Sequence, residues 1–469
     1  MNATKILNKY FGHPSFRGLQ QEIIKHIVAH KHALVIMPTG MGKSLCYQIP
    51  ALMQKGLTLV ISPLIALMKD QVDALQRHNI DAAFINSSLT KKSRESRYQA
   101  VQDGQYKLLY VTPERFRKKE FVEIISQRKI DLLAVDEAHC ISEWGHDFRP
   151  DYTRLGEFRQ IVGNPTTIAL TATATPEVQN DIISQLGLRN TEVRRFHEGI
   201  DRPNLHLDVA EIWGEEEKLN EILKMQQKHG GTGIIYFSLI KTLKQFSELL
   251  DRKKVRHFCY HGDLDRVERK QVQDAFMKGK NKLVLATNAF GMGIDKEDIR
   301  FVIHAEVPGS MESYYQEIGR AGRDGLDSDC LLLYDEQDLL IQMEFIKWNN
   351  PNAEYYERVY NFLLEELEKI NAYGLEGFKE KLHFKSRRDF RLETVLSILD
   401  RYAVVEGNIE SKNLTVEAAL PDHLCDQKYL DAKLQREQHK LYALVQYAKT
   451  EDNRKAFIHE YFGLPYPAK

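Results

Sequence analysis

The sequence is poor in cysteine and has no paired cysteine motif. Its five cysteines are scattered over 469 residues, and no two of them stand in a Cys-x-x-Cys arrangement: Cys46, Cys140, Cys259, Cys330 and Cys425. This spacing argues against a disulfide framework and against a zinc site built from cysteines.

Long hydrophobic runs and an excess of charge of one sign are also absent. No apolar stretch is long enough to span a bilayer, and the first residues form no signal-peptide pattern. We therefore predict a cytoplasmic protein with no membrane partner. The formal net charge is -1, so any nucleic-acid binding must come from local basic patches. The length allows two to four domains.

A phosphate-binding loop is predicted at residues 37–44, with the sequence MPTGMGKS. An apolar run (33–36) precedes it as a buried strand, and a helix starts after it. Backbone N–H groups at such a helix start face phosphates, with Lys43 on the β/γ-phosphates and the Ser44 hydroxyl on Mg²⁺. The alternative is a chance match in a surface loop, and the first glycine of the usual pattern is Met37 here. The further predicted nucleotide contacts are Thr39, Gly40, Met41 and Gly42.

Apolar strands alternate with helical stretches from residue 33 to about residue 200. The other expected strands are 58–61, 83–85, 107–111, 132–135 and 167–170. Continuous Val/Ile/Leu runs separated by helices indicate an α/β fold with a parallel sheet covered on both faces. Ligands of such sheets bind at the carboxyl ends of the strands, where this sequence places several polar clusters.

Two acids, Asp136 and Glu137, directly follow one of these buried strands. Asp136 is placed to hold Mg²⁺, and Glu137 to polarise the attacking water as general base. The alternative is a pair of acids that cap the next helix. Lys43 together with Asp136 favours a nucleoside-triphosphate hydrolase.

A possible adenine site lies ahead of the phosphate loop. An aromatic residue, Arg17 and Gln20 follow His13 there, and the Gln20 amide can pair with both a donor and an acceptor on the base edge. The alternative is an amphipathic helix with Gln20 in solvent.

Several of these segments resemble the motifs of superfamily 2 helicases. The resemblance rests on residues 62–71 (SPLIALMKDQ), the Asp-Glu-Ala-His box and Thr171-Ala-Thr-Ala. Residues 139–150 (HCISEWGHDFRP) resemble the aromatic-rich loop that separates RecQ-type DNA helicases from other members. In this loop Trp144, His146, Phe148 and Arg149 could stack on single-stranded bases, with a core packing role as the alternative.

A second α/β lobe without its own phosphate loop is predicted at about 207–340, after a Pro-containing linker (199–206). Strands are expected at 233–237, 283–287 and 301–304. Residues 288–295 resemble helicase motif V, and the resemblance implies that Asp295 contacts the nucleotide. Residues 316–325 (QEIGRAGRDG) resemble motif VI. Gln316 opens that motif, and either Arg320 or Arg323 is predicted to act as an arginine finger, with a structural ion pair as the alternative.

Polar and basic residues at the strand ends are candidates for phosphate contacts that read no base sequence. The predicted set, beside the aromatic loop, is Ser62, Lys69, Thr112, Arg115 and Thr173. Basic runs at 91–94 and 115–119 either add affinity or form solvated helix faces.

Beyond residue 340 the chain departs from the RecQ pattern. Helices are predicted at 353–372, 375–382 and 390–402, followed by a hairpin at 404–416. This order is typical of a winged helix with basic residues Lys385, Arg387, Arg388 and Arg391, and a helical bundle is the alternative. The tail resembles the helical hairpin of the RecQ zinc module, but Asn453 stands where the family carries its first zinc cysteine. We predict no zinc, either because the metal was lost or because the chain was cut.

The predicted domains are 1–205 (first RecA-like lobe, ATP binding), 206–340 (second RecA-like lobe) and 341–469 (mostly helical accessory region). The resemblance implies an ATP- and Mg²⁺-dependent 3′→5′ DNA helicase, acting on single-stranded and tailed or forked duplex DNA in repair and recombination, near the bacterial nucleoid. The alternatives are an RNA helicase and a DNA-clamping motor that does not unwind.

Overall fold

The computed structural model describes residues 2–38, 40–142, 149–279, 282–291, 294, 296–382 and 389–466. The chain divides into two compact units. Unit 1 consists of Met1–Pro308, Glu312–Tyr334 and Tyr447–Lys469, and unit 2 consists of Gly309–Met311 and Asp335–Gln446. Among the described helices, none combines the length and the hydropathy needed to cross a bilayer.

The first sheet of unit 1 is parallel throughout, with strand order β3-β4-β2-β5-β6-β1-β7. Its strands are β1 (His32–Ile36), β2 (Leu57–Ile61), β3 (Ala82–Ile85), β4 (Leu108–Val111), β5 (Ile130–Val135), β6 (Thr166–Thr171) and β7 (Val193–His197). Its helices are α1 (Ala3–Phe11), α2 (Gln20–Val28), α3 (Leu45–Met53), α4 (Ile65–Arg77), α5 (Lys91–Gln102), α6 (Lys119–Ser126), α7 (Leu155–Ile161) and α8 (Pro176–Gln185).

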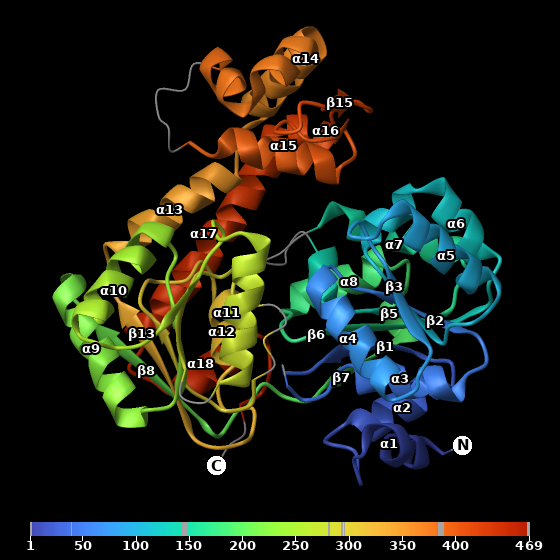
Figure 1. Cartoon of the computed structure of the whole chain (residues 1–469), viewed down its shortest axis with the longest axis horizontal. Helices are drawn as coiled ribbons and strands as arrows, with labels where there is room; N and C mark the ends of the chain where they lie inside the picture. Colours follow the sequence, from blue (N-terminus) through green and yellow to red (C-terminus); the bar gives the residue numbers. More distant parts are fainter. Residues whose placement is uncertain are drawn as a thin grey trace. The chain divides into compact units, whose positions relative to one another are not determined.

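This sheet is buried on both faces, because alternate residues of its strands enter two separate cores. One face packs its side chains, such as Leu59, with α5 to α8, and the other face packs residues such as Val60 with α2 to α4. Helices therefore flank the sheet (Figure 1). Burial on both faces explains why these strands read as continuous apolar runs.

The second sheet of unit 1 is also parallel, with order β10-β11-β9-β12-β13-β8. Its strands are β8 (Leu205–Glu211), β9 (Thr232–Tyr236), β10 (Phe258–Tyr260), β11 (Leu283–Ala286), β12 (Ile299–His304) and β13 (Ser328–Tyr334). Its helices are α9 (Gly214–His229), α10 (Ile240–Arg252), α11 (Arg266–Lys278) and α12 (Met311–Ile318), and α18 (Arg454–Tyr461) belongs to the same unit.

Unit 2 is mostly helical and has its own hydrophobic core. Its elements are α13 (Asp338–Asn349), α14 (Ala353–Lys381), α15 (Arg391–Arg401), β14 (Val405–Glu406), β15 (Thr415–Val416), α16 (Asp422–Cys425) and most of α17 (Gln427–Lys449). Helix α14 is interrupted at Gly374, whose φ is 71°, close to the predicted break. The antiparallel β14–β15 pair is the predicted hairpin.

The predicted fold class is confirmed: two RecA-like parallel-sheet lobes are followed by a helical region. The winged-helix assignment and the domain boundaries stay predictions. Strands β7, β8, β10 and β13 were not predicted. Strand β7 lies at the edge of its sheet and exposes Arg194 and Arg195, so its sequence lacks the continuous apolar run of a central strand.

Candidate nucleotide and nucleic-acid site

The phosphate loop follows β1 and ends at Ser44, which precedes the first residue of α3. Gly42 has φ 76°, a backbone conformation in which a side chain would be strained, and a Cβ atom there would also displace the Gln20 Nε2 atom, 2.7 Å away. The Lys43 Nζ atom donates to the Met37 carbonyl oxygen at 3.0 Å, which folds the ammonium back over the loop. Burial lowers the pKa of Lys43, while the charges of Glu137 and Asp136 act in the opposite direction.

The two acids follow β5, two strands away from β1 in the sheet. Glu137 is left-handed, with φ 48° and ψ 47°, which is unusual for a residue with a side chain and is typical of functional sites. Its N–H donates to the Asp136 Oδ1 atom at 3.0 Å. Burial, and then the charge of Glu137, raise the pKa of Asp136, and Lys43 partly opposes them.

This donor set fits Mg²⁺. Asp136 is a half-buried carboxylate whose ionised form is disfavoured by burial and by a second carboxylate, so a cation would stabilise it. The Ser44 hydroxyl and Asp136 would hold the ion, because carboxylate and hydroxyl oxygens are the ligands that Mg²⁺ prefers.

A series of polar contacts links Glu137 on the first sheet of unit 1 to Gln316 on the second. His139 Nδ1 lies 3.4 Å from the Glu137 Oε2 atom and 3.0 Å from the Thr171 hydroxyl. The Thr171 hydroxyl donates to the Thr173 carbonyl oxygen, and Gln316 Nε2 donates to the Thr173 hydroxyl at 3.3 Å. Sequence reasoning gave His139 and Thr171 no role, although both stand in motifs that it quoted.

The predicted adenine contacts differ in exposure. His13 and Arg17 are exposed, whereas Gln20 is buried. The Gln20 amide nitrogen donates to the carbonyl oxygens of Met41 and Gly42, at 2.8 and 3.2 Å, and its oxygen accepts from the Arg17 N–H at 3.0 Å. Gln20 thus supports the phosphate loop, and its contact with adenine stays a prediction.

Two of the predicted DNA contacts, Ser62 and Thr112, lie at the ends of neighbouring strands. Ser62 follows β2 and Thr112 follows β4, and the Ser62 N–H donates to the Val111 carbonyl oxygen at 3.1 Å. Among the described residues the buried Ser62 hydroxyl has no hydrogen-bond partner. Lys69 is exposed on α4 and Arg115 is half-buried. Arg149 donates to the Pro63 carbonyl oxygen at 3.3 Å.

Some predicted contacts fall outside the described residues, and others are already paired. Thr39, Trp144, His146, Phe148 and Asp295 lie outside, as do Lys385, Arg387 and Arg388. In the basic run at 115–119, Arg117 forms two bonds of 2.6 Å with Asp151, and Phe116 stacks on Phe158. Arg391 bonds to Asp389. These three side chains are therefore at least partly structural.

The two candidate arginine fingers have different surroundings. Arg320 is buried and donates to the Gly291 carbonyl oxygen. Arg323 is half-exposed, and its Cγ and Cδ atoms lie 3.3 Å from the point where a Cβ atom of residue 40 would be. Arg323 also lowers the pKa of Lys43 as a minor contribution beside burial. Geometry therefore places Arg323, rather than Arg320, next to the phosphate loop.

The predicted absence of zinc stays a prediction. In the described part of the chain, no group of three or more His, Cys, Asp or Glu side chains could hold a metal ion. Asn453 caps α18, because its Oδ1 atom accepts from the N–H groups of Lys455 and Ala456 at 2.9 and 3.2 Å.

Comparisons with known proteins agree with this geometry. The DEAD/DEAH box helicase family matches residues 17–182, and the helicase conserved C-terminal domain matches residues 214–325. The chain is 46% identical over 347 residues to "ATP-dependent DNA helicase RecQ" of Bacillus subtilis, covering 74% of this chain and 58% of that protein. It is 41% identical to "Probable ATP-dependent DNA helicase RecS" of the same species, covering 74% of this chain and 70% of that protein.

The chain belongs to the RecQ family of superfamily 2 helicases. It spans between half and three fifths of the length of the first three RecQ relatives. Among solved structures, Mss116p bound to single-stranded RNA and AMP-PNP has a TM-score of 0.59 at 16% identity, covering 86% of this chain and 92% of that one. This likeness shows the fold that the RecQ family shares with other superfamily 2 helicases.

Proposed function

We propose that this chain hydrolyses ATP with Mg²⁺ and uses the reaction to move 3′→5′ along single-stranded DNA and to separate duplex DNA. The observation that carries the proposal is the approach of Arg323, from the second lobe, to a phosphate loop whose Lys43 is within electrostatic reach of Asp136 and Glu137. The names of the RecQ relatives support DNA as the substrate. The polarity and a role in repair rest on the family resemblance.

Each residue of the site then has a distinct task. Lys43 neutralises the β- and γ-phosphates, and exchanges its bond to the Met37 carbonyl oxygen for bonds to phosphate oxygens. Bound Mg²⁺ would neutralise charge that develops on the phosphate oxygens. Glu137 orients the attacking water, and its left-handed backbone sets the direction of its side chain. Arg323 stabilises the transition-state charge, which in other phosphoryl-transfer enzymes is worth roughly 10³- to 10⁵-fold in rate.

The series of polar contacts from Glu137 to Gln316 offers a route for coupling. It joins the general base on the first lobe to the start of motif VI on the second through His139, Thr171 and Thr173. A change in the position of one lobe would therefore alter the orientation of the base. The pair of Ser62 and Thr112 at neighbouring strand ends fits a phosphate backbone, with the aromatic loop as the proposed base-stacking element.

The test is ATP hydrolysis measured with no nucleic acid, with single-stranded DNA and with single-stranded RNA at matched salt. Strong stimulation by DNA alone is expected, followed by unwinding of a duplex with a 3′ tail and not of one with a 5′ tail. Stronger stimulation by RNA would instead identify an RNA helicase. Stimulation by DNA without strand separation on either tailed duplex would identify a motor that clamps or slides.

A further inference from the structure

The turn that carries Arg323, called here the arginine turn (residues 319–326), is fastened by main-chain contacts. The Gly322 N–H donates to the Ile299 carbonyl oxygen at 2.9 Å, and the preceding Arg320 side chain bonds to Gly291. Gly322 has φ 55°, and a Cβ atom there would lie 2.8 Å from the Leu326 carbonyl oxygen. The turn is therefore tightly folded, and its carbonyl groups need donors from elsewhere.

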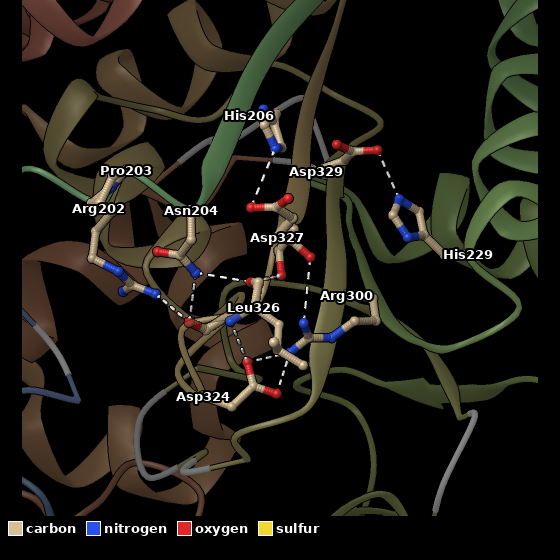
Figure 2. Close-up of polar contacts among 12 residues, drawn as sticks. Arg202, Pro203, Asn204, His206, His229, Arg300, Asp324, Leu326, Asp327 and Asp329 are labelled. Carbon is tan, nitrogen blue, oxygen red and sulfur yellow. Dashed lines mark hydrogen bonds and ion pairs between the residues drawn. The ribbon is translucent and has the colours of Figure 1, made fainter.

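Those donors come from the joint between the two sheets (residues 199–204). The Arg202 guanidinium donates to the carbonyl oxygens of Gly319, Ala321 and Gly322, at 3.3, 2.7 and 2.9 Å. Asn204 Nδ2 donates to the carbonyl oxygens of Gly322 and Leu326, at 2.8 and 3.0 Å. In Figure 2, Arg202 and Asn204 reach the turn from one side while Arg300 pairs with Asp324 on the other.

Arg202 is chemically unusual in this place. Burial lowers the pKa of Arg202, and its hydrogen bonds are with main-chain carbonyls instead of with a carboxylate. A half-buried cation of this kind is stabilised while the carbonyls keep their positions, so the cation and the turn fix each other. Only arginine presents several donors in one plane, and the point charge of lysine cannot replace this fork.

We infer that Arg202 is a positioning residue for Arg323: it fixes the carbonyl groups of three residues that precede the finger and so holds the guanidinium at the phosphate loop. The inference rests on the proposed ATP hydrolysis. Arg202 itself lies behind the turn and acts through Arg323. The joint that links the two sheets thus also sets the geometry of the transition-state site.

The main test is Arg202→Lys, which keeps the charge and loses the fork. We expect the DNA-stimulated kcat to fall by roughly 10- to 100-fold, the effect of a displacement near 1 Å, with KM for ATP unchanged. In an Arg323→Ala background the same substitution should lower kcat no further, because the residue through which it acts is gone.

The matched control is Arg300→Lys. Arg300 contacts the same turn from its other side, through two bonds to the carboxylate of Asp324, at 2.6 and 2.7 Å. Its main-chain bonds are to the carbonyl oxygens of Glu297 and Asp327, and not to those of residues 319–322. Its variant should keep the wild-type kcat. An Arg202→Lys variant with wild-type kcat, or one that loses equal activity with and without Arg323, would overturn the inference.

Hydrogen exchange separates this inference from the proposed function. The Gly322 N–H should exchange faster in Arg202→Lys than in the wild type, whether or not the chain hydrolyses ATP. If the chain does not hydrolyse ATP but exchange is faster in Arg202→Lys, the proposed function is rejected and the inference that Arg202 positions the turn is retained. Unchanged exchange would reject the positioning by itself.

Discussion

Lys43 is held over the phosphate loop by the Met37 carbonyl oxygen, close to two carboxylates. We predict that Lys43→Ala lowers ATP hydrolysis by at least about 10²-fold, because a preorganised positive charge at the phosphates is lost. Single-stranded DNA binding should be largely retained, since the proposed DNA contacts are other residues. Steady-state hydrolysis and fluorescence anisotropy would measure the two effects.

The control for this substitution is Lys31→Ala, which changes an exposed lysine just before β1, at the opposite end of that strand from the phosphate loop. It should hydrolyse ATP like the wild type. Turnover by Lys43→Ala at the rate of this control would remove Lys43 from the mechanism.

At the scale of residues, the sequence allowed predictions for candidate site residues that are marked by their neighbours along the chain. Asp136 and Glu137 were predicted because they directly follow a buried strand, and Lys43 and Ser44 because they end a loop between a buried strand and a helix start. The sequence could not separate Arg320 from Arg323, because both lie in one motif. In the structure Arg320 bonds to the Gly291 carbonyl oxygen and Arg323 lies at the phosphate loop, and the identity of the finger stays a prediction. The left-handed backbone of Glu137 had no sequence signal either.

Strand β13 and helix α9 are joined by one acid with two basic partners. Lys228 and His229, at the end of α9, both bond to Asp329, and the His229 distance is 2.7 Å. Figure 2 shows the Asp329–His229 pair beside the arginine turn. Burial alone would raise the pKa of Asp329, but these bonds outweigh it and the pKa is lowered.

A lowered carboxyl pKa stabilises the fold above the unfolded-state pKa of about 3.9, and the gain is lost as pH falls through the folded-state value. We therefore predict that Asp329→Asn destabilises the protein by roughly 1 kcal/mol at pH 7, a modest effect because Lys228 is mostly exposed. Thermal melts at a series of pH values would show the difference in melting temperature between the wild type and Asp329→Asn becoming smaller below about pH 4. A difference in melting temperature that stays constant with pH would mean that the ion pair contributes no stability.

At the scale of elements, three of the four edge strands (β7, β8 and β10) were missed and the edge strand β3 was predicted. The central strand β13 was missed as well, although it is buried at every position. Strand β5 is buried at every position, whereas β8 alternates buried and exposed residues and was assigned in part to the linker. An edge strand needs apolar residues on fewer positions, so its sequence resembles that of a loop. Strand β10 is only three residues long and gives too short a pattern.

At the scale of the whole molecule, unit 2 is an insertion into unit 1. The chain leaves unit 1 after Tyr334 and returns at Tyr447, and the Lys449 ammonium lies 5.8 Å from the centre of the Tyr334 ring. The two crossing points are therefore close together, which is the arrangement that tolerates domain insertion. The sequence predicted one accessory region from residue 341 to the last residue, and the segment from Tyr447 onward is grouped with unit 1. The domain boundaries themselves stay predictions.

We predict that replacing residues 335–446 by a short Gly/Ser linker leaves unit 1 folded, because unit 2 has a core of its own. The variant should melt in one cooperative transition by calorimetry and still bind ATP. A matched variant that also lacks residues 447–466 loses the hydrogen bonds of Tyr447 with Tyr314 and of Tyr461 with Glu312, and should melt at a lower temperature. Equal melting temperatures would mean that the returning segment is dispensable for the fold.

The returning segment also sets the order in which the protein can be completed during synthesis. The Lys455 ammonium donates to the carbonyl oxygens of Arg202 and Pro203, at 2.9 and 3.2 Å, across more than 250 residues of chain. Domains form from the N-terminus as the ribosome proceeds, and contacts of such long sequence separation close late. The phosphate loop can therefore fold early on the growing chain, whereas the joint that holds the arginine turn receives its last two bonds only after residue 455 has been made.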